Sequence, residues 1–104
     1  MSTNKGVAVV TGSAQGIGYD IALRLASDGF DIGLNDISSK RDQLRAVADE
    51  IEKIGQKVVV VTADVSVEEE VKGLVQEVVE KLGSLDVVSA IFDARIFAHS
   101  GLRW

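Results

Sequence analysis

The chain has 104 residues, a net charge of −5 at pH 7, no cysteine and a hydrophobic share of 46%. This length fits one small domain, the hydrophobic share favours a folded core, and the acidic balance argues against nucleic acid as a partner. The longest strongly apolar run, Val58–Val61, is far shorter than the roughly 20 residues of a membrane-spanning helix. We therefore expect a cytoplasmic protein that binds neither nucleic acid nor membranes.

The first two predicted strands flank a helix. Residues 6–10 (GVAVV) and 31–36 (DIGLND) are short buried-strand runs. A helix is predicted over 16–28, because apolar residues recur every four positions beside a stripe of small residues. Gly29 is the residue expected just past its end. The apolar positions are Ile17, Ile21 and Leu25, and the small positions are Gly18, Ala22 and Ala26.

A second helix and a third strand follow. Ser38 or Ser39 is expected to cap a helix that ends at Gly55. Residues 57–62 (KVVVVT) then form a strand that is apolar on both faces, which is typical of a central parallel strand. The apolar face of the helix consists of Leu44, Val47, Ile51 and Ile54.

A third helix and a fourth strand complete the pattern. Ser66 and Glu69 match a capping box, in which each side chain satisfies a free backbone N–H of the first helical turn. The helix that follows ends at Gly83, and residues 85–88 begin the fourth strand. The apolar side of this helix consists of Val71, Leu74, Val75, Val78 and Leu82.

The order of these elements predicts the fold class. Strands that alternate with helices across short loops form parallel βαβ units. We therefore expect an α/β fold, the βαβαβαβ half of a Rossmann-type domain, with strand order 3-2-1-4. The first two helices should cover one face of the sheet and the third helix the other.

The segment TGSAQGIG, residues 11–18, joins the first strand to the first helix and carries three glycines. Gly12 permits a tight turn, Gly16 leaves room for a pyrophosphate beside the backbone, and Gly18 lets the helix pack closely. The helix N-terminus offers free N–H groups and a positive dipole end to an anion. We interpret this segment as the phosphate-binding loop of a dinucleotide site.

The spacing G-x-x-x-G-x-G resembles the TGxxxGIG signature of short-chain dehydrogenases/reductases, and the resemblance extends over residues 6–88. It implies NAD(P)-dependent interconversion of an alcohol and a carbonyl. More narrowly, QGIGYDIALRLASDGFDIGLND is similar to the acetoin (diacetyl) reductase branch, whose substrates are small vicinal diketones and hydroxyketones. The residues expected to bind the cofactor are Gly12, Ser13, Gln15, Gly16, Ile17, Gly18, Asp36, Ile37, Asp64 and Val65.

Two acids follow the strands of this predicted half-domain. A carboxylate at Asp36 would accept hydrogen bonds from both adenosine ribose hydroxyls and would repel a 2′-phosphate. Residues 13–15 carry no cation and Arg41 is poorly placed, so NAD is favoured over NADP. Asp64 and Val65 resemble the family's Asp-Val pair at the adenine ring. The structural alternatives are a strand-end cap for Asp36 and an ordinary turn acid for Asp64.

The catalytic pattern of the family is not found in this sequence. The family uses a Tyr-x-x-x-Lys pair, a serine and an asparagine, whereas Tyr19 here is followed four residues later by Leu23. We expect Tyr19 to be a partly exposed surface residue, and His99 has no partner for a metal site. No catalytic residue is assigned. We divide the chain into a dinucleotide-binding half, residues 1–88, and a non-family tail, residues 89–104.

Three interpretations stay open at this point. The chain is a truncated oxidoreductase that binds NAD without turnover, a truncated interaction or regulatory subunit, or a non-functional splice or gene-model product. The second interpretation predicts pairing with a full-length relative, or with itself, through the exposed edge of the fourth strand. The sequence leaves open the substrate, the oligomeric state and whether the isolated chain folds.

Overall fold

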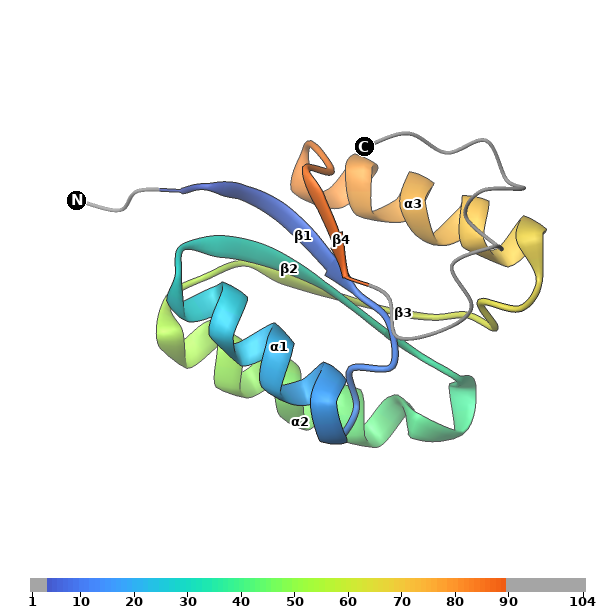
Figure 1. The fold of residues 1–104 in the computed structure, drawn as a ribbon, viewed down its shortest axis with the longest axis horizontal. Coiled ribbons are helices and arrows are strands. Elements are labelled where there is room, and N and C mark those ends of the chain that lie inside the picture. The colour runs from blue at the N-terminus through green and yellow to red at the C-terminus, as the bar shows by residue number, and fades with distance from the viewer. Residues whose placement is uncertain (1–3, 90–104) are drawn as a thin grey trace.

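Residues 4–89, the part of the chain that the structure describes, contain a parallel sheet of four strands in the order β3-β2-β1-β4 (Figure 1). The structure is a computed structural model. The predicted α/β class and strand order are confirmed, and the predicted tail lies outside the described residues apart from Ser89. The elements in chain order are β1 (Gly6–Val10), α1 (Gly16–Ser27), β2 (Phe30–Asp36), the 3₁₀ turn η1 (Ser38–Lys40), α2 (Arg41–Ile54), β3 (Val58–Thr62), α3 (Glu68–Leu82) and β4 (Val87–Ser89).

The sheet is covered on both faces, by α1 and α2 on one side and by α3 on the other (Figure 1). Side chains alternate between the two faces of a strand, so β1 supplies both layers of the core. Ala8 and Val10 pack with α1 and α2, whereas Val7 and Val9 pack with α3. All four side chains are buried, as the interior position of β1 requires.

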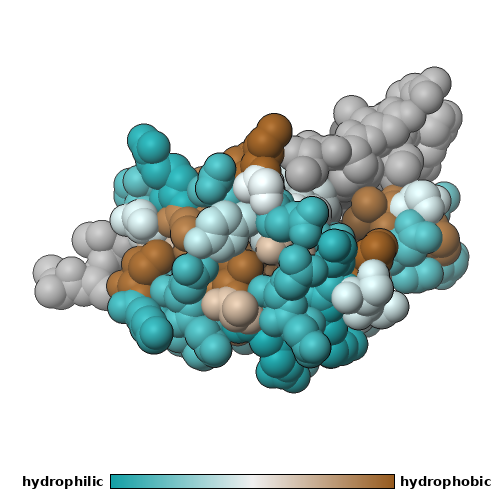
Figure 2. Space-filling view, turned by 90° about the horizontal axis from the view of Figure 1, so that it is seen from below, coloured by the Kyte–Doolittle hydropathy of each residue, from teal (hydrophilic) through white to brown (hydrophobic). Residues whose placement is uncertain are grey.

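The outer surfaces of α1 and α2 are mostly hydrophilic, with separate apolar spots rather than one continuous patch (Figure 2). Among the described residues, no helix is long and apolar enough to cross a membrane. The same residues contain no group of three or more metal-ligating side chains. The large apolar side chains that are exposed are Ile17, Ile37, Ile54, Val67 and Val79.

The small residues of α1 are its buried positions, and Ile21 and Leu25 pack beside them against the same core while partly exposed. Gly18, Ala22 and Ala26 are buried, whereas the side chain of Ile17 is 69% exposed. Small side chains let the helix axis approach the sheet closely. Of the three apolar positions predicted for this helix, Ile21 and Leu25 are confirmed, and Ile17, in the first turn, is wrong.

The predicted serine cap of α2 is wrong. Neither Ser38 nor Ser39 caps this helix, because both lie in η1 and α2 begins only at Arg41, without a side-chain cap. The extra 3₁₀ turn takes the place of the cap. The predicted end at Gly55 is confirmed, and Ile54 in the last turn is 43% exposed rather than part of the apolar face.

The predicted capping box of α3 is also wrong. The N-cap is Val67, and it makes no side-chain hydrogen bond to the helix. The Ser66 hydroxyl instead donates to Asp64 Oδ1 at 2.6 Å. Glu70 rather than Glu69 reaches back, accepting the Asp64 N–H at 2.7 Å. These bonds satisfy the loop before α3 instead of the free N–H groups of its first turn.

β3 lies at an edge of the described sheet, not at its centre. Its one neighbouring strand within residues 4–89 is β2, with Leu34 opposite Val60. Val58, Val59 and Val60 are consequently only partly buried, although the run is apolar on both faces. The interpretation of this run as a central strand is wrong. Helices α2 and α3 cover its two faces, which explains the apolar side chains, but the edge of β3 that points away from β2 has no strand beside it within residues 4–89.

Asp86 joins the loop before β4 to the first strand. Its Oδ2 accepts the Val7 N–H at 2.8 Å and the Ser84 hydroxyl at 2.9 Å, while the Asp86 N–H donates to the Val7 carbonyl at 2.8 Å. The backbone hydrogen bond from Val7, followed by the bond from Ser84, lowers the pKa of the Asp86 carboxyl below its ordinary 3.8.

We expect Asp86→Asn to reduce stability at neutral pH and to flatten its loss in acid. Because the folded-state pKa is lowered, the Asp86 carboxylate stabilises the fold above the ordinary pKa, and this contribution disappears as pH falls through the folded-state pKa. Urea unfolding midpoints measured from neutral pH to about pH 2 test this, with exposed Asp20→Asn as the control. An unchanged midpoint of Asp86→Asn at neutral pH would contradict the assignment.

Candidate functional site

The carboxyl ends of β1, β2 and β3 converge on one side of the sheet, where the loops that follow them enclose a pocket of about 130 Å³. In open parallel sheets, ligands bind outside the carboxyl ends of the strands. Five of the predicted cofactor residues line this pocket, which brings together the glycine loop and the ends of two further strands. They are Gly12, Asp36, Ile37, Asp64 and Val65.

The glycine loop has the backbone conformation that glycine permits. Gly12 and Gly16 both have φ of +63°, a left-handed conformation that L side chains rarely adopt. No heavy atom outside the neighbouring residues lies within 4 Å of where a Cβ on Gly16 would stand. The backbone at Gly16 is therefore open to an approaching ligand.

Gly18 is the point of closest packing within the loop. A Cβ there would lie 2.7 Å from the carbonyl carbon of Gly12 and 3.1 Å from Cα of Ser13. The first turn of α1 thus rests on the backbone of its own preceding loop. The sequence attributed this glycine to packing between helix and sheet, but the contact that excludes a side chain is with the loop.

Ser13 anchors the loop to β2 through buried polar bonds. The Ser13 N–H donates to the Asn35 carbonyl at 2.9 Å, and the Ser13 hydroxyl accepts the Asn35 N–H at 3.0 Å. The side-chain amide of Asn35 in turn donates to the carbonyls of Val61, at 3.0 Å, and Ala63, at 3.3 Å. The Ser13 side chain, predicted to bind cofactor, is turned toward the sheet.

Asn35 is the site residue that the sequence interpretation missed. It is 1% exposed and ties together the three strand ends that form the pocket. The available signal was an amide side chain near the end of a buried strand, directly after Leu34 and before Asp36. A buried amide needs hydrogen-bond partners, and backbone carbonyls at the end of the next strand supply them.

The Asp36 carboxylate lies against the glycine loop. Its Oδ2 accepts the Ala14 N–H at 3.2 Å, and its Oδ1 accepts the Ile37 N–H at 2.9 Å. The carboxylate thus joins the end of β2 to the loop and is only partly buried at the pocket. It does not cap the following helix, whose first turn has no side-chain cap.

Asp64 forms the opposite side of the pocket. Its Oδ1 accepts both the hydroxyl of Ser66 and the Ser66 N–H, at 2.6 and 2.9 Å. The hydrogen bond from the Ser66 hydroxyl, followed by the backbone bond from Ser66, lowers the pKa of the Asp64 carboxyl. This compact turn holds Val65, which is partly buried, at the pocket beside Asp64.

The N-terminus of α1 is suited to an anion. Its first turn contains no acidic side chain, and no side chain caps it. The first N–H groups of a helix have no intrahelical acceptor and carry the positive end of its dipole. Gln15, the N-cap, points its Oε1 toward Lys40 Nζ at 3.2 Å and Gln43 Nε2 at 3.1 Å. Gln15, Gly16 and Ile17 are all exposed here.

Tyr19 lies in the second turn of α1 and does not line the pocket. Its hydroxyl donates to Glu50 Oε1 on α2 at 3.0 Å. The hydrogen bond to Glu50 is the main cause of a raised pKa for the Tyr19 hydroxyl. The expectation of a partly exposed surface residue is confirmed, since Tyr19 is intermediate in burial.

Comparisons with known proteins place this arrangement among characterised folds. Residues 6–91 match the family model for short chain dehydrogenases. A short-chain dehydrogenase/reductase of Armillaria gallica is 52% identical over 82 residues, which is 79% of this chain and 31% of that relative. The chain therefore spans about a third of the length of that curated relative.

Solved structures of dehydrogenases have a fold similar to that of this chain. A dehydrogenase/reductase from Sinorhizobium meliloti 1021 superposes with a TM-score of 0.79 at 36% identity, covering 86% of this chain and 35% of that one. Carveol dehydrogenase from Mycobacterium avium, solved in complex with NAD, superposes with a TM-score of 0.76 at 32% identity. That likeness covers 83% of this chain and 35% of the carveol dehydrogenase chain.

Proposed function

The chain belongs to the short-chain dehydrogenase/reductase family, a family of oxidoreductases, and on that premise we propose that it binds a nicotinamide dinucleotide at the carboxyl ends of β1, β2 and β3. The observation that carries this proposal is the hydrogen bond between Ala14 N–H and Asp36 Oδ2. It holds a carboxylate suited to ribose hydroxyls directly against a loop suited to phosphates.

The residues present fit the adenosine and pyrophosphate portions of such a cofactor. The N–H groups at the start of α1, near Gly16 and Ile17, would hold the pyrophosphate, since no Cβ on Gly16 blocks their approach. Asp36 would accept the ribose hydroxyls. Ile37, Asp64 and Val65 would border the adenine. When bound, the nicotinamide of such a cofactor accepts or supplies a hydride.

We propose NAD rather than NADP as the preferred cofactor. The Asp36 carboxylate would repel a 2′-phosphate, and the guanidinium of Arg41 is engaged elsewhere, with Nη2 donating to Thr62 Oγ1 at 2.9 Å. Lys40, which the sequence interpretation did not consider, contacts the glycine loop through Gln15. Once the carboxylate is removed, Lys40 and Arg41 can exchange these exposed hydrogen bonds for contacts with a 2′-phosphate.

Asp36→Ala tests the cofactor proposal. We expect the affinity for NAD to fall by roughly tenfold or more, because hydrogen bonds to a charged group are worth about 1.5–3 kcal/mol. The affinity for NADP should rise, because Lys40 and Arg41 then face a 2′-phosphate without an opposing carboxylate. Calorimetric titration of both cofactors measures this, with Asp42→Ala on α2 as the control. Unchanged affinity of Asp36→Ala for NAD would refute the assignment.

We further propose that these 104 residues bind the cofactor without transferring hydride. The family resemblance implies a tyrosine whose pKa a nearby lysine lowers, whereas the pKa of Tyr19 is raised and its hydroxyl bonds Glu50. Diacetyl and acetoin, the substrates that the resemblance to the acetoin reductase branch implies, serve as probes. NADH mixed with the protein and either compound should be oxidised no faster than in a protein-free control. If NADH were oxidised and Tyr19→Phe abolished that oxidation, the proposal that the chain transfers no hydride would be overturned.

A further inference from the structure

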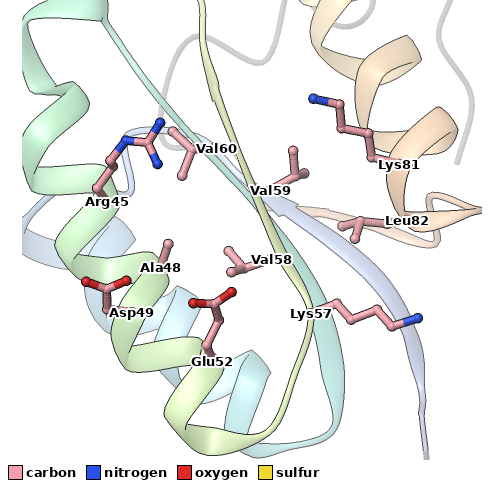
Figure 3. A pocket seen from close by; sticks show the side chains of 10 residues that line it. All are labelled: Arg45, Ala48, Asp49, Glu52, Lys57, Val58, Val59, Val60, Lys81 and Leu82. Carbon is pink, nitrogen blue, oxygen red and sulfur yellow. The ribbon is translucent and has the colours of Figure 1, made fainter.

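A groove of about 570 Å³ follows the open side of β3, between α2 and α3 (Figure 3). Val58, Val59 and Val60 line it. Within residues 4–89, no strand pairs with β3 on this side. The dinucleotide pocket lies elsewhere, at the carboxyl ends of the strands, so the proposed function does not use this groove.

The backbone groups on this side of β3 follow from its register with β2. The Ile32 N–H donates to the Lys57 carbonyl at 2.9 Å, and the Ala63 N–H donates to the Asp36 carbonyl at 3.1 Å. Odd-numbered residues of β3 therefore bond β2. Because a strand alternates the direction of its hydrogen-bonding groups, those of Val58 and Val60 point into the groove. A strand edge of this kind is a template for another strand.

Helix α2 forms one wall of the groove, and the charge of its side chains changes sign along that wall. Four of its residues line the groove at helical spacing, and Arg45 lies at the Val60 end while Glu52 lies at the Val58 end (Figure 3). The stripe is thus positive at one end and negative at the other. Its members in order are Arg45, Ala48, Asp49 and Glu52.

We propose that a second copy of this chain docks here, its β3 antiparallel to the first about a two-fold axis at Val59. In this register Val58 of each copy lies opposite Val60 of the other, so the outward N–H and carbonyl groups of both residues pair. The two sheets become one continuous sheet. A two-fold interface of this kind closes on itself and does not propagate into a fibre.

Charge complementarity favours this arrangement over a parallel one. The two-fold axis reverses α2, so Arg45 of each copy faces Glu52 of the other, and the favourable pair occurs twice. Parallel pairing of the same two edges would turn the second copy over, so that its α2 lies on the α3 side of the first copy and the Arg45–Glu52 pairs are lost. The two Lys57 side chains are kept apart, because four positions along the ladder separate them, roughly 13 Å.

The spacing of the layers also fits. α2 packs on both β2 and β3, so its axis lies inside the sheet edge. Two such helices would stand about two strand spacings apart, roughly 10 Å, which is an ordinary distance for packed helices. Ala48 lies at the centre of the stripe, where a small side chain permits this approach. The Asp49 side chains of the two copies then lie near each other, and the repulsion between their negative charges weakens the interface.

Sedimentation equilibrium of the 104-residue chain tests the proposal. We expect a reversible dimer, and Arg45→Glu or Glu52→Arg should each weaken it about tenfold, because two favourable charge pairs become repulsive. The double variant Arg45→Glu/Glu52→Arg should restore dimerisation to within about threefold of the original, because it swaps both partners. Asp49→Asn should strengthen the dimer. Arg24→Glu, on α1 and away from the groove, is the matched control.

Amide hydrogen exchange at increasing protein concentration gives a second readout. Protection should rise at Val58 and Val60, whose N–H groups point outward, and stay constant at Val59 and Val61, which bond β2. A monomer at all concentrations would overturn the proposal. A dimer whose single and double charge variants behave alike, or whose protection ignores this alternation, would overturn it as well.

Discussion

Replacing Gly18 with alanine is expected to weaken dinucleotide binding strongly and to destabilise the fold. A Cβ at this position would stand 2.7 Å from the carbonyl carbon of Gly12, and this neighbour is backbone that cannot rotate away. Alanine favours a helix by about 1 kcal/mol over glycine, but overpacking costs about 1–3 kcal/mol. The glycine loop must shift, and with it the N–H groups proposed to hold the pyrophosphate. We expect the affinity for NAD to fall more than tenfold.

Calorimetric titration with NAD and urea unfolding together measure this effect. Gly73→Ala is the matched control, since Gly73 lies within α3 and a Cβ added there would meet no neighbouring atom within 4 Å. That substitution should stabilise the fold by about 0.5–1 kcal/mol and leave NAD binding unchanged. If Gly18→Ala also gained stability and kept its affinity for NAD, the close contact with Gly12 would not be needed for folding or for cofactor binding.

Asn35→Asp is expected to cause the largest loss of stability. The Asn35 amide donates to two carbonyls, those of Val61 and Ala63, and the residue is 1% exposed. A carboxylate of the same shape would direct a buried negative charge at both carbonyl oxygens. Leaving a buried charge without partners costs about 3–5 kcal/mol, so we expect a loss in free energy of unfolding of about 3 kcal/mol or more.

The pH dependence of this variant separates charge from shape. The introduced carboxyl should have a raised pKa in the folded state, because burial disfavours its charge. Its destabilising effect should therefore diminish as pH falls and the protonated group donates to one carbonyl. Asn35→Ala removes the donors without adding charge and should cost about 1–3 kcal/mol with little pH dependence. Equal stability of Asn35→Asp and the unsubstituted protein would contradict the role assigned to this amide.

Element order and strand order could be predicted because they depend on repeating patterns. The period of apolar residues distinguishes Val58–Thr62 from the helices beside it, and Gly55 and Gly83 end α2 and α3 with left-handed backbone. Helix starts were harder to predict. Ser66 had two available partners, the free N–H groups of α3 and the Asp64 carboxylate, and local sequence does not say which bond forms.

Some residues of the candidate site could likewise be predicted from the sequence, and others could not. The glycine spacing and Asp36 were evident in the sequence, and the structure brings Gly12, the first of the three glycines, and Asp36 to one pocket. Ser13 and Asn35 were not resolved by the sequence, because the partners of each lie on a different strand. Ser13 turned out to bind β2 through its hydroxyl, and Asn35 proved to connect β2 with the end of β3.

By itself the sequence determined the family, the α/β class and the location of the glycine loop, because these depend on residue type and on spacing along the chain. Tertiary structure alone decided which side chains of those segments face a ligand and which face the sheet. It also set β3 at an open edge with the Arg45–Glu52 stripe beside it. The physical reason is that hydrogen-bond partners and burial depend on distances between segments, and those distances exist only once the strands have paired.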